Sequence, residues 1–182
     1  MIYIALLRAI NLAGRARVSM SDLRELFTTL GFGDVRTILQ SGNVVFRSSA
    51  RSSAQLERRL ETETAKPLHL QTDFFVRSAD EWRGILADNP FREEVVRDPG
   101  HLTVTFLKKA PSGKDVEALQ AAIKGREIVR PGGRHAYIIY PDGIGRSRLT
   151  SAVIEKMLGS RGTARNWNTV FKLAELATPA KH

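Results

Sequence analysis

The segment Val35-Arg36-Thr37-Ile38-Leu39-Gln40-Ser41-Gly42-Asn43-Val44-Val45-Phe46 decides the fold of the first half of the chain. Its two ends, Val35–Leu39 and Val44–Phe46, are short runs rich in β-branched and apolar residues. The polar turn Ser41-Gly42-Asn43 between them is typical of a β-hairpin. We therefore predict two neighbouring antiparallel strands here.

The flanking sequence places a helix and a strand on each side of this hairpin. Apolar residues recur at helical spacing from Leu23 to Leu30, and Gly31 is expected to end that helix. A second helix is expected from Ser53 to Lys66, and the apolar runs Ile2–Leu7 and Leu70–Val76 are predicted strands. The resulting order β-α-β-β-α-β is the split βαβ pattern of a ferredoxin-like unit.

The second half of the chain shows a similar order of predicted elements. We expect strands at 102–107, 127–129 and 136–140, and helices at 112–123 and 147–158. The pattern then diverges, because 161–165 predicts at most a short strand, after which Asn166 is expected to cap a last helix.

The predicted fold class is therefore α+β, with two tandem ferredoxin-like subdomains, the second followed by a C-terminal helix. The expected boundaries are an N-terminal subdomain at 1–77, a helix and linker at 78–100, and a C-terminal subdomain at 101–182.

Composition excludes several classes of protein. The 182 residues are 42% hydrophobic and 26% charged, as in ordinary globular proteins. The absence of cysteine excludes disulfides, thiolate metal sites and thiol nucleophiles, and the four histidines share no metal-ligand spacing. Ile2–Leu7 is too short to cross a bilayer and lacks the flanks of a signal peptide. We expect a cytoplasmic protein that binds neither a metal nor a membrane.

The positive charge is concentrated in the second half. The formal net charge is +9, and residues 91–182 carry 16 Lys and Arg against 9 Asp and Glu, a net +7. A basic half indicates an anionic partner such as a nucleotide, a nucleic acid or phosphate. Because the charges are scattered along the chain, solubility with a bias toward arginine is the alternative explanation.

The loop Tyr140-Pro141-Asp142-Gly143-Ile144-Gly145-Arg146-Ser147-Arg148-Leu149-Thr150 is the strongest candidate for a binding site. Its glycines let the backbone approach a ligand, and the helix that follows would point unpaired N–H groups at an anion. It is not a P-loop, because no Gly-Lys-Ser/Thr ending is present. The alternative is a tight turn and a helix capped by Ser147.

Three other polar segments are candidates for the same ligand. They are the loop from Arg8 to Arg17, the hairpin turn, and Arg165-Asn166-Trp167-Asn168-Thr169, although each also has a structural explanation in turns and caps. The predicted contacts are Arg8, Asn11, Arg15, Arg17, Gln40, Asn43, Arg146, Ser147, Arg148, Arg165 and Asn168.

Five motifs occur along the whole chain in a fixed order. They are Ala5-Leu6-Leu7-Arg8-Ala9-Ile10-Asn11, Gln40-Ser41-Gly42-Asn43-Val44-Val45-Phe46, Asn89-Pro90-Phe91, the Tyr140–Thr150 loop, and Thr163 with Arg165–Thr169.

Together these motifs resemble the bacterial domain-of-unknown-function 1697 family. The resemblance implies a two-subdomain α+β fold with ferredoxin-like halves, and no established activity, substrate or catalytic residue. The chain departs from the family pattern at Ala9 and Ala13, which stand where the family's first loop usually has glycines.

Three functions remain open from the sequence. The leading hypothesis is a binding protein for an anionic ligand, either a nucleotide or a nucleic acid. The second is a metal-free enzyme acting on a phosphorylated small molecule, for which Asp142 is the only carboxylate within the motifs. The third is a structural or protein-interaction module. The sequence indicates no cofactor, no catalytic residue and no oligomeric state.

Overall fold

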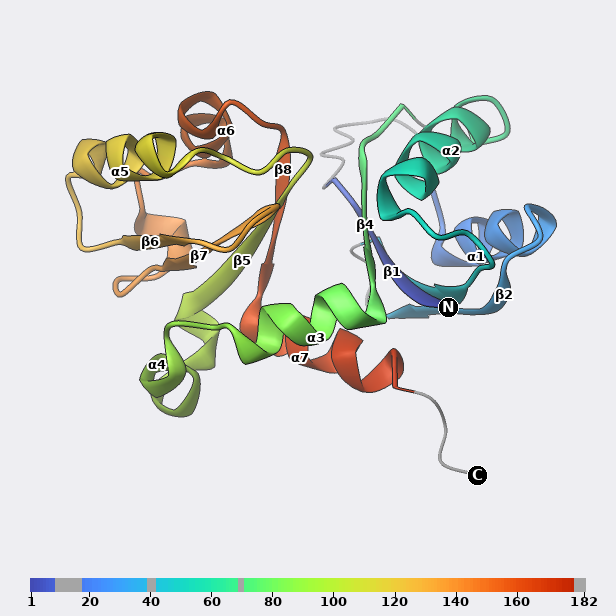
Figure 1. Ribbon diagram of the computed structural model, residues 1–182, viewed down its shortest axis with the longest axis horizontal. Helices are drawn as coiled ribbons and strands as arrows, with labels where there is room; N and C mark the ends of the chain where they lie inside the picture. The colour runs from blue at the N-terminus through green and yellow to red at the C-terminus, as the bar shows by residue number, and fades with distance from the viewer. Residues whose placement is uncertain (9–17, 39–41, 69–70, 179–182) are drawn as a thin grey trace. The chain divides into compact units, whose positions relative to one another are not determined.

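The structure, a computed structural model, describes residues 1–8, 18–38, 42–68 and 71–178. These residues form a mixed α/β protein with two four-stranded antiparallel sheets and accompanying helices (Figure 1). The chain divides into two compact units, Met1–Gly84 with Leu173–His182, and Ile85–Lys172. These bounds differ from the predicted ones, because the end of the chain belongs to the first unit.

The first unit contains a sheet in the order β2-β3-β1-β4, with every neighbouring pair antiparallel. The predicted hairpin is confirmed as β2 paired with β3. The strands are β1 (Ile2–Leu7), β2 (Gly33–Ile38), β3 (Asn43–Arg47) and β4 (Phe74–Ser78).

Helices α1 (Met20–Thr29) and α2 (Ser53–Ala65) pack on one face of this sheet (Figure 1). Apolar residues at helical spacing on both helices meet alternate residues of the strands in one buried cluster. Phe27 and Phe46 both belong to it, with ring centroids 5.2 Å apart in an edge-to-face arrangement.

The second unit has a sheet in the order β6-β7-β5-β8, again with antiparallel neighbours. The segment predicted to be at most a short strand forms the five-residue edge strand β8, which pairs along its length with β5. The strands are β5 (Leu102–Leu107), β6 (Ile128–Pro131), β7 (His135–Ile139) and β8 (Gly162–Asn166).

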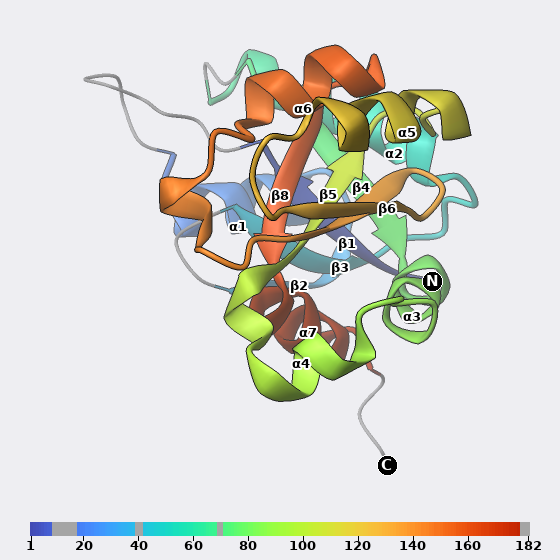
Figure 2. The ribbon, with the colours of Figure 1, turned by 90° about the vertical axis from the view of Figure 1, so that its left-hand side faces the viewer.

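Helices α5 (Gly113–Ala122) and α6 (Ser151–Leu158) lie along one side of the second sheet (Figure 2). Ser112 and Asp115 form a capping box at the start of α5, the helix predicted at 112–123. Gly159 ends α6 in the left-handed conformation, with φ of 63°, which confirms the predicted helix end.

Of the remaining helices, α3 (Ala79–Ala87) and α4 (Arg92–Arg97) lie between the two sheets in the sequence, and α7 (Trp167–Leu176) follows the last strand. The chain passes from the first unit to the second within α3 and returns within α7. The predicted cap of the last helix is confirmed, since the Asn166 side chain accepts a hydrogen bond from Thr169 N at 2.9 Å. Helix α4 was not expected from the sequence.

Candidate ligand-binding cavity of the second unit

The loop after β7 forms two tight turns before α6 begins. Gly143 has a φ of 84°, a conformation that favours glycine, and its N–H donates to Tyr140 O at 2.9 Å. A short 3-10 helix, Ile144–Arg146, follows. The glycines of the predicted motif therefore shape a turn that brings the loop to the start of α6.

Helix α6 begins four residues later than predicted. Its cap is Thr150, whose hydroxyl accepts from Val153 N at 3.4 Å. Ser147 instead donates its hydroxyl proton to the Glu127 carboxylate and accepts from Leu149 N at 3.0 Å. The N–H groups of Ser151 and Ala152, at the first two helical positions, have no partner within the helix, as at any helix start.

A cavity of about 250 Å³ lies between this loop, α6 and strands β5 and β8. Its floor is formed by buried residues, including Tyr140, Leu149 and Ile154, whereas Ile144 is 57% exposed. The polar residues that line it are Thr105, Tyr140, Ser147, Thr150, Ser151, Glu155 and Thr163.

Thr105, on the floor of the cavity, is 5% exposed, and its hydroxyl oxygen has no hydrogen-bond partner among the described residues. A buried hydroxyl without a partner costs free energy, and such groups are rare in folded proteins. Thr105 is therefore a cavity residue whose hydroxyl is not satisfied by the described protein groups.

Glu155 supplies a carboxylate to the same cavity. One of its oxygens accepts a hydrogen bond from Gly162 N, the first residue of β8, at 2.9 Å. This bond joins α6 to β8 and fixes the carboxylate beside the strand.

Tyr140 presents a neutral phenol to the cavity. Burial, assisted by the nearby Glu127 carboxylate, raises the pKa of Tyr140 to about 12. Its hydroxyl donates to Leu149 O at 3.5 Å.

The charged residues of the loop lie at the surface. Arg146 and Arg148 are exposed and flank Ser147 in the chain, but they do not line the cavity. Asp142 forms an ion pair with Arg126, and the hydrogen bond from Arg126 lowers the pKa of the Asp142 carboxyl. Asp142 is therefore engaged outside the cavity.

The predicted contacts of the C-terminal motif lie elsewhere in this unit. Arg165 follows Ala164 on β8, so its side chain projects from the face opposite to that of Thr105, which pairs with Ala164. The Arg165 guanidinium donates to the Thr163 hydroxyl at 2.8 Å, and burial lowers the pKa of Arg165 to about 10. Asn168 is exposed on α7.

The other predicted contacts belong to the first unit or lie outside the described residues. Arg8 lies 3.5 Å from the Asp73 carboxylate, and Asn43 is fully buried, donating to Ile38 O at 3.2 Å across the hairpin. Four predicted contacts lie outside the described residues: Asn11, Arg15, Arg17 and Gln40. Of the eleven predicted contacts, the structure brings together Arg146, Ser147 and Arg148.

Thr105 and Glu155 are two of the cavity residues that were not among the predicted contacts. Thr105 lies on a strand where threonine alternates with apolar residues. That alternation was the only sequence signal that set Thr105 apart. Glu155 is one of several charged residues on helices, and nothing in its local sequence distinguishes it.

The first unit has a larger cavity, of about 310 Å³, near Met1, Arg47, Asp80 and Arg83. Its charged side chains contact other charged groups, since Arg83 pairs with Asp80 and Arg47 lies 2.9 Å from Asp34. It contains none of the predicted contacts, and we therefore consider the cavity of the second unit the better candidate.

No group of three or more His, Asp or Glu residues within the described ranges could hold a metal ion. None of the described helices combines the length and apolar character needed to cross a membrane.

Comparisons with known proteins give a family and a fold. A family model described as protein of unknown function (DUF1697) matches residues 1–137. A solved structure titled "The structure of conserved bacterial protein SP0830 from Streptococcus pneumoniae" is similar, with 24% identity and a TM-score of 0.77, over 97% of this chain and 98% of the other. No curated protein matches the chain.

Proposed function

Since the chain belongs to the DUF1697 family of proteins of unknown function, its own geometry is the guide to its ligand, and we propose that it binds a small anionic ligand in the cavity at the start of α6. The observation that carries the proposal is the buried residue Thr105, which lines that cavity and whose hydroxyl has no hydrogen-bond partner among the described residues.

The start of α6 favours a negative charge. Ser151, the first residue of the helix, lines the cavity, and its N–H group and the positive end of the helix dipole favour an anion there. The hydroxyls of Thr150 and Ser151 add further hydrogen-bonding groups. Arg146 and Arg148, exposed on the adjoining loop, would raise the rate at which an anion arrives.

The size of the cavity favours a small ligand over a polymer. Its volume of about 250 Å³ is below the range of roughly 300–1,000 Å³ typical of sites for drug-sized molecules. A phosphate with a small organic group attached would fill it, whereas a nucleic acid would need an extended basic surface.

A second candidate function is an enzyme that acts on a phosphorylated small molecule. It is favoured by Glu155, because a carboxylate lining a phosphate site is in a position to act as a general base. Asp142, the carboxylate within the motif, is held by Arg126 and is not needed in this version.

We also infer that each unit is a ferredoxin-like subdomain. The support is the β-α-β-β-α-β order in each unit and the equivalent strand orders, β2-β3-β1-β4 and β6-β7-β5-β8.

The variant Ser151→Pro tests the anion site. Proline is favoured at the first helical position, and Thr150 before it has an extended backbone, with ψ of 162°, that proline accepts. The change removes one N–H from the proposed site while preserving the helix. We expect unchanged thermal stability and about tenfold weaker binding of inorganic phosphate, measured by titration calorimetry.

Two controls accompany this measurement. Ser151→Ala keeps the N–H and should retain most of the affinity. Arg97→Ala removes an exposed arginine on α4 and should leave phosphate binding unchanged. The double variant Arg146→Ala with Arg148→Ala should weaken phosphate binding. Equal affinity of the Ser151→Pro variant and the natural protein would place the anion elsewhere. A steep fall of binding with salt, seen only with oligonucleotides, would favour nucleic acid.

A further inference from the structure

The two ends of the cavity have opposite electrostatic character. Ser151 and Glu155 both line it and lie four residues apart on α6, on the same helical face. At 1.5 Å per residue they are separated by about 6 Å along the helix axis. The cavity therefore runs from a helix N-terminus, which favours an anion, to a carboxylate, which repels one.

The carboxylate end also contains the Thr105 hydroxyl. A Cβ atom added at Gly162, whose N–H holds Glu155, would lie 3.2 Å from the Thr105 methyl group, so Thr105 and the Gly162–Glu155 contact are neighbours. The same Cβ atom would lie 3.0 Å from Leu107 Cδ2 and from Phe106 O, so glycine at this position lets β8 pack closely against β5. Two residues of different hydrogen-bonding character therefore line this part of the cavity: Glu155, whose carboxylate only accepts, and Thr105, whose hydroxyl can donate and accept.

A ligand group suited to this end must donate a hydrogen bond to Glu155 and exchange one with Thr105. An ionised carboxylate has about four acceptor positions, so it can accept from a ligand while it accepts from Gly162 N. A hydroxyl meets both requirements. A second phosphate does not, because it only accepts and carries a like charge.

We propose that the ligand of this cavity is a small phosphorylated polyol, a sugar phosphate in chemical class. Its phosphate lies at the start of α6, and a hydroxyl about 6 Å away donates to Glu155 and contacts Thr105. This inference rests on the proposed function, since it assumes that an anion occupies the helix N-terminus. It also gives the ligand a direction in the cavity, with its phosphate at the start of α6 and its hydroxyl at Glu155.

The test compares three probes by titration calorimetry on the full chain. Methyl phosphate carries the anionic group without hydroxyls, ribose 5-phosphate carries both, and fructose 1,6-bisphosphate carries an anion at each end. We expect ribose 5-phosphate to bind at least about tenfold more tightly than methyl phosphate, and the bisphosphate to bind more weakly than ribose 5-phosphate.

Glu155→Gln then identifies the group responsible. Its amide oxygen can still accept from Gly162 N, while the charge is lost. The variant should lose most of the preference for ribose 5-phosphate over methyl phosphate and should bind the bisphosphate better. Thr105→Val, which removes only the hydroxyl, provides a second variant and should lower the same preference by about threefold to tenfold.

The outcomes separate this inference from the proposed function. Suppose that Ser151→Pro weakens the binding of methyl phosphate, but ribose 5-phosphate binds no more tightly than methyl phosphate. The proposal of a sugar phosphate ligand is then wrong, and the proposed anion site stands. A preference that survives both Glu155→Gln and Thr105→Val also overturns the inference. If neither monophosphate binds, the proposed function and the inference both fail.

Discussion

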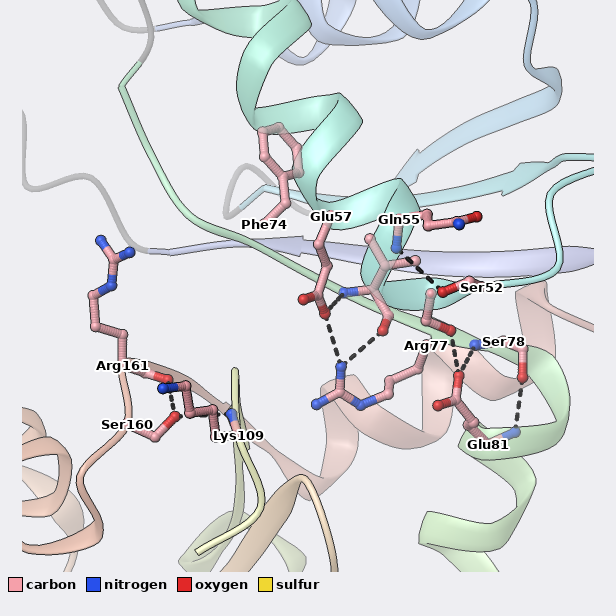
Figure 3. Close-up of polar contacts among 12 residues, drawn as sticks. Ser52, Gln55, Glu57, Phe74, Arg77, Ser78, Glu81, Lys109, Ser160 and Arg161 are labelled. Atoms are coloured by element: carbon pink, nitrogen blue, oxygen red, sulfur yellow. Dashed lines mark hydrogen bonds and ion pairs between the residues drawn. The ribbon is translucent and has the colours of Figure 1, made fainter.

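The Glu57 carboxylate on α2 accepts a hydrogen bond from the Arg77 guanidinium on β4 at 3.1 Å, with both side chains almost completely buried (Figure 3). The same oxygen accepts from Val76 N at 2.9 Å. One helical turn further, Glu61 accepts from Phe74 N at 3.0 Å. Two carboxylates four residues apart on α2 thus bind the backbone of β4, an edge strand of the first sheet.

These two carboxylates provide a matched pair for a stability measurement. Glu57→Ala removes both the buried charge that faces Arg77 and the acceptor for Val76 N. We expect the free energy of unfolding to fall by about 3 kcal/mol, since breaking a buried ion pair costs roughly 3–5 kcal/mol. Glu61→Ala removes an acceptor from a half-buried site and should cost about 1 kcal/mol. Urea denaturation measures both, and equal losses would contradict the special role of the ion pair.

Gly42 and Gly31 make a second matched pair. Both have positive φ, 71° and 83°, so alanine is strained at either position by about 1 kcal/mol. Only at Gly42 would the added Cβ meet another atom, Leu7 Cβ at 2.9 Å. Leu7 N also donates to Gly42 O at 2.8 Å, so the two backbones cannot easily separate.

We therefore expect Gly42→Ala to lower the melting temperature clearly more than Gly31→Ala does. The additional overpacking cost is about 1–3 kcal/mol. Thermal denaturation followed by circular dichroism measures the difference. If both alanines cost the same, backbone strain alone would explain why the hairpin turn has glycine.

The elements predicted well are those whose signal is local. The hairpin, the helix from Ser112 and the end of α6 at Gly159 each depend on turn and cap residues adjacent in the sequence. Strand β8 was underestimated because Gly162-Thr163-Ala164-Arg165-Asn166 lacks an apolar alternation. Its conformation comes from pairing with β5, more than fifty residues away in the chain.

The same distinction applies to the candidate site. The Tyr140–Thr150 loop was predicted, and it does line a cavity. Its helix start was placed wrongly, since Ser147 and Thr150 are equally good caps in sequence. Only Glu127, a residue from another segment, decides between them by accepting from Ser147. Thr105 and Glu155 reach the cavity through tertiary packing, which a local pattern does not encode.

Tyr140→Phe should change the response of stability to alkaline pH. Burial raises the pKa of Tyr140 to about 12, whereas an unfolded tyrosine titrates near 10. Above pH 10 the unfolded chain therefore binds fewer protons than the folded chain, and stability falls as the pH rises toward 12. Tyr137, whose pKa burial also raises to about 12, contributes in the same direction.

The phenylalanine variant should lose less stability than the natural protein between pH 9 and pH 11.5, by about 2 kcal/mol. Arg165 acts in the opposite direction, because burial lowers its pKa to about 10, but it is common to both proteins and cancels in the comparison. Urea denaturation at the two pH values checks the difference. Parallel losses in the two proteins would mean that Tyr140 ionises as readily when folded.

Thr103 and Thr105 give the last prediction, because they differ in one respect. They lie two residues apart on β5, on the same face of the sheet, and each is 5% exposed. The Thr103 hydroxyl donates to Ile138 O at 3.4 Å, whereas that of Thr105 has no partner among the described residues. Valine replaces the hydroxyl by a methyl group of similar size at either position.

Thr103→Val should lower the free energy of unfolding by about 1 kcal/mol, since a buried hydrogen bond is lost. Thr105→Val should leave it unchanged or raise it by up to about 1 kcal/mol, because burying a methyl group costs less than burying a hydroxyl without a partner. A residue retained against stability in this way is typical of a binding site. Urea denaturation of both variants, together with titrations of each with ribose 5-phosphate, tests whether the Thr105 hydroxyl serves the fold or a ligand. A destabilised Thr105→Val protein with full affinity would assign the hydroxyl to the fold.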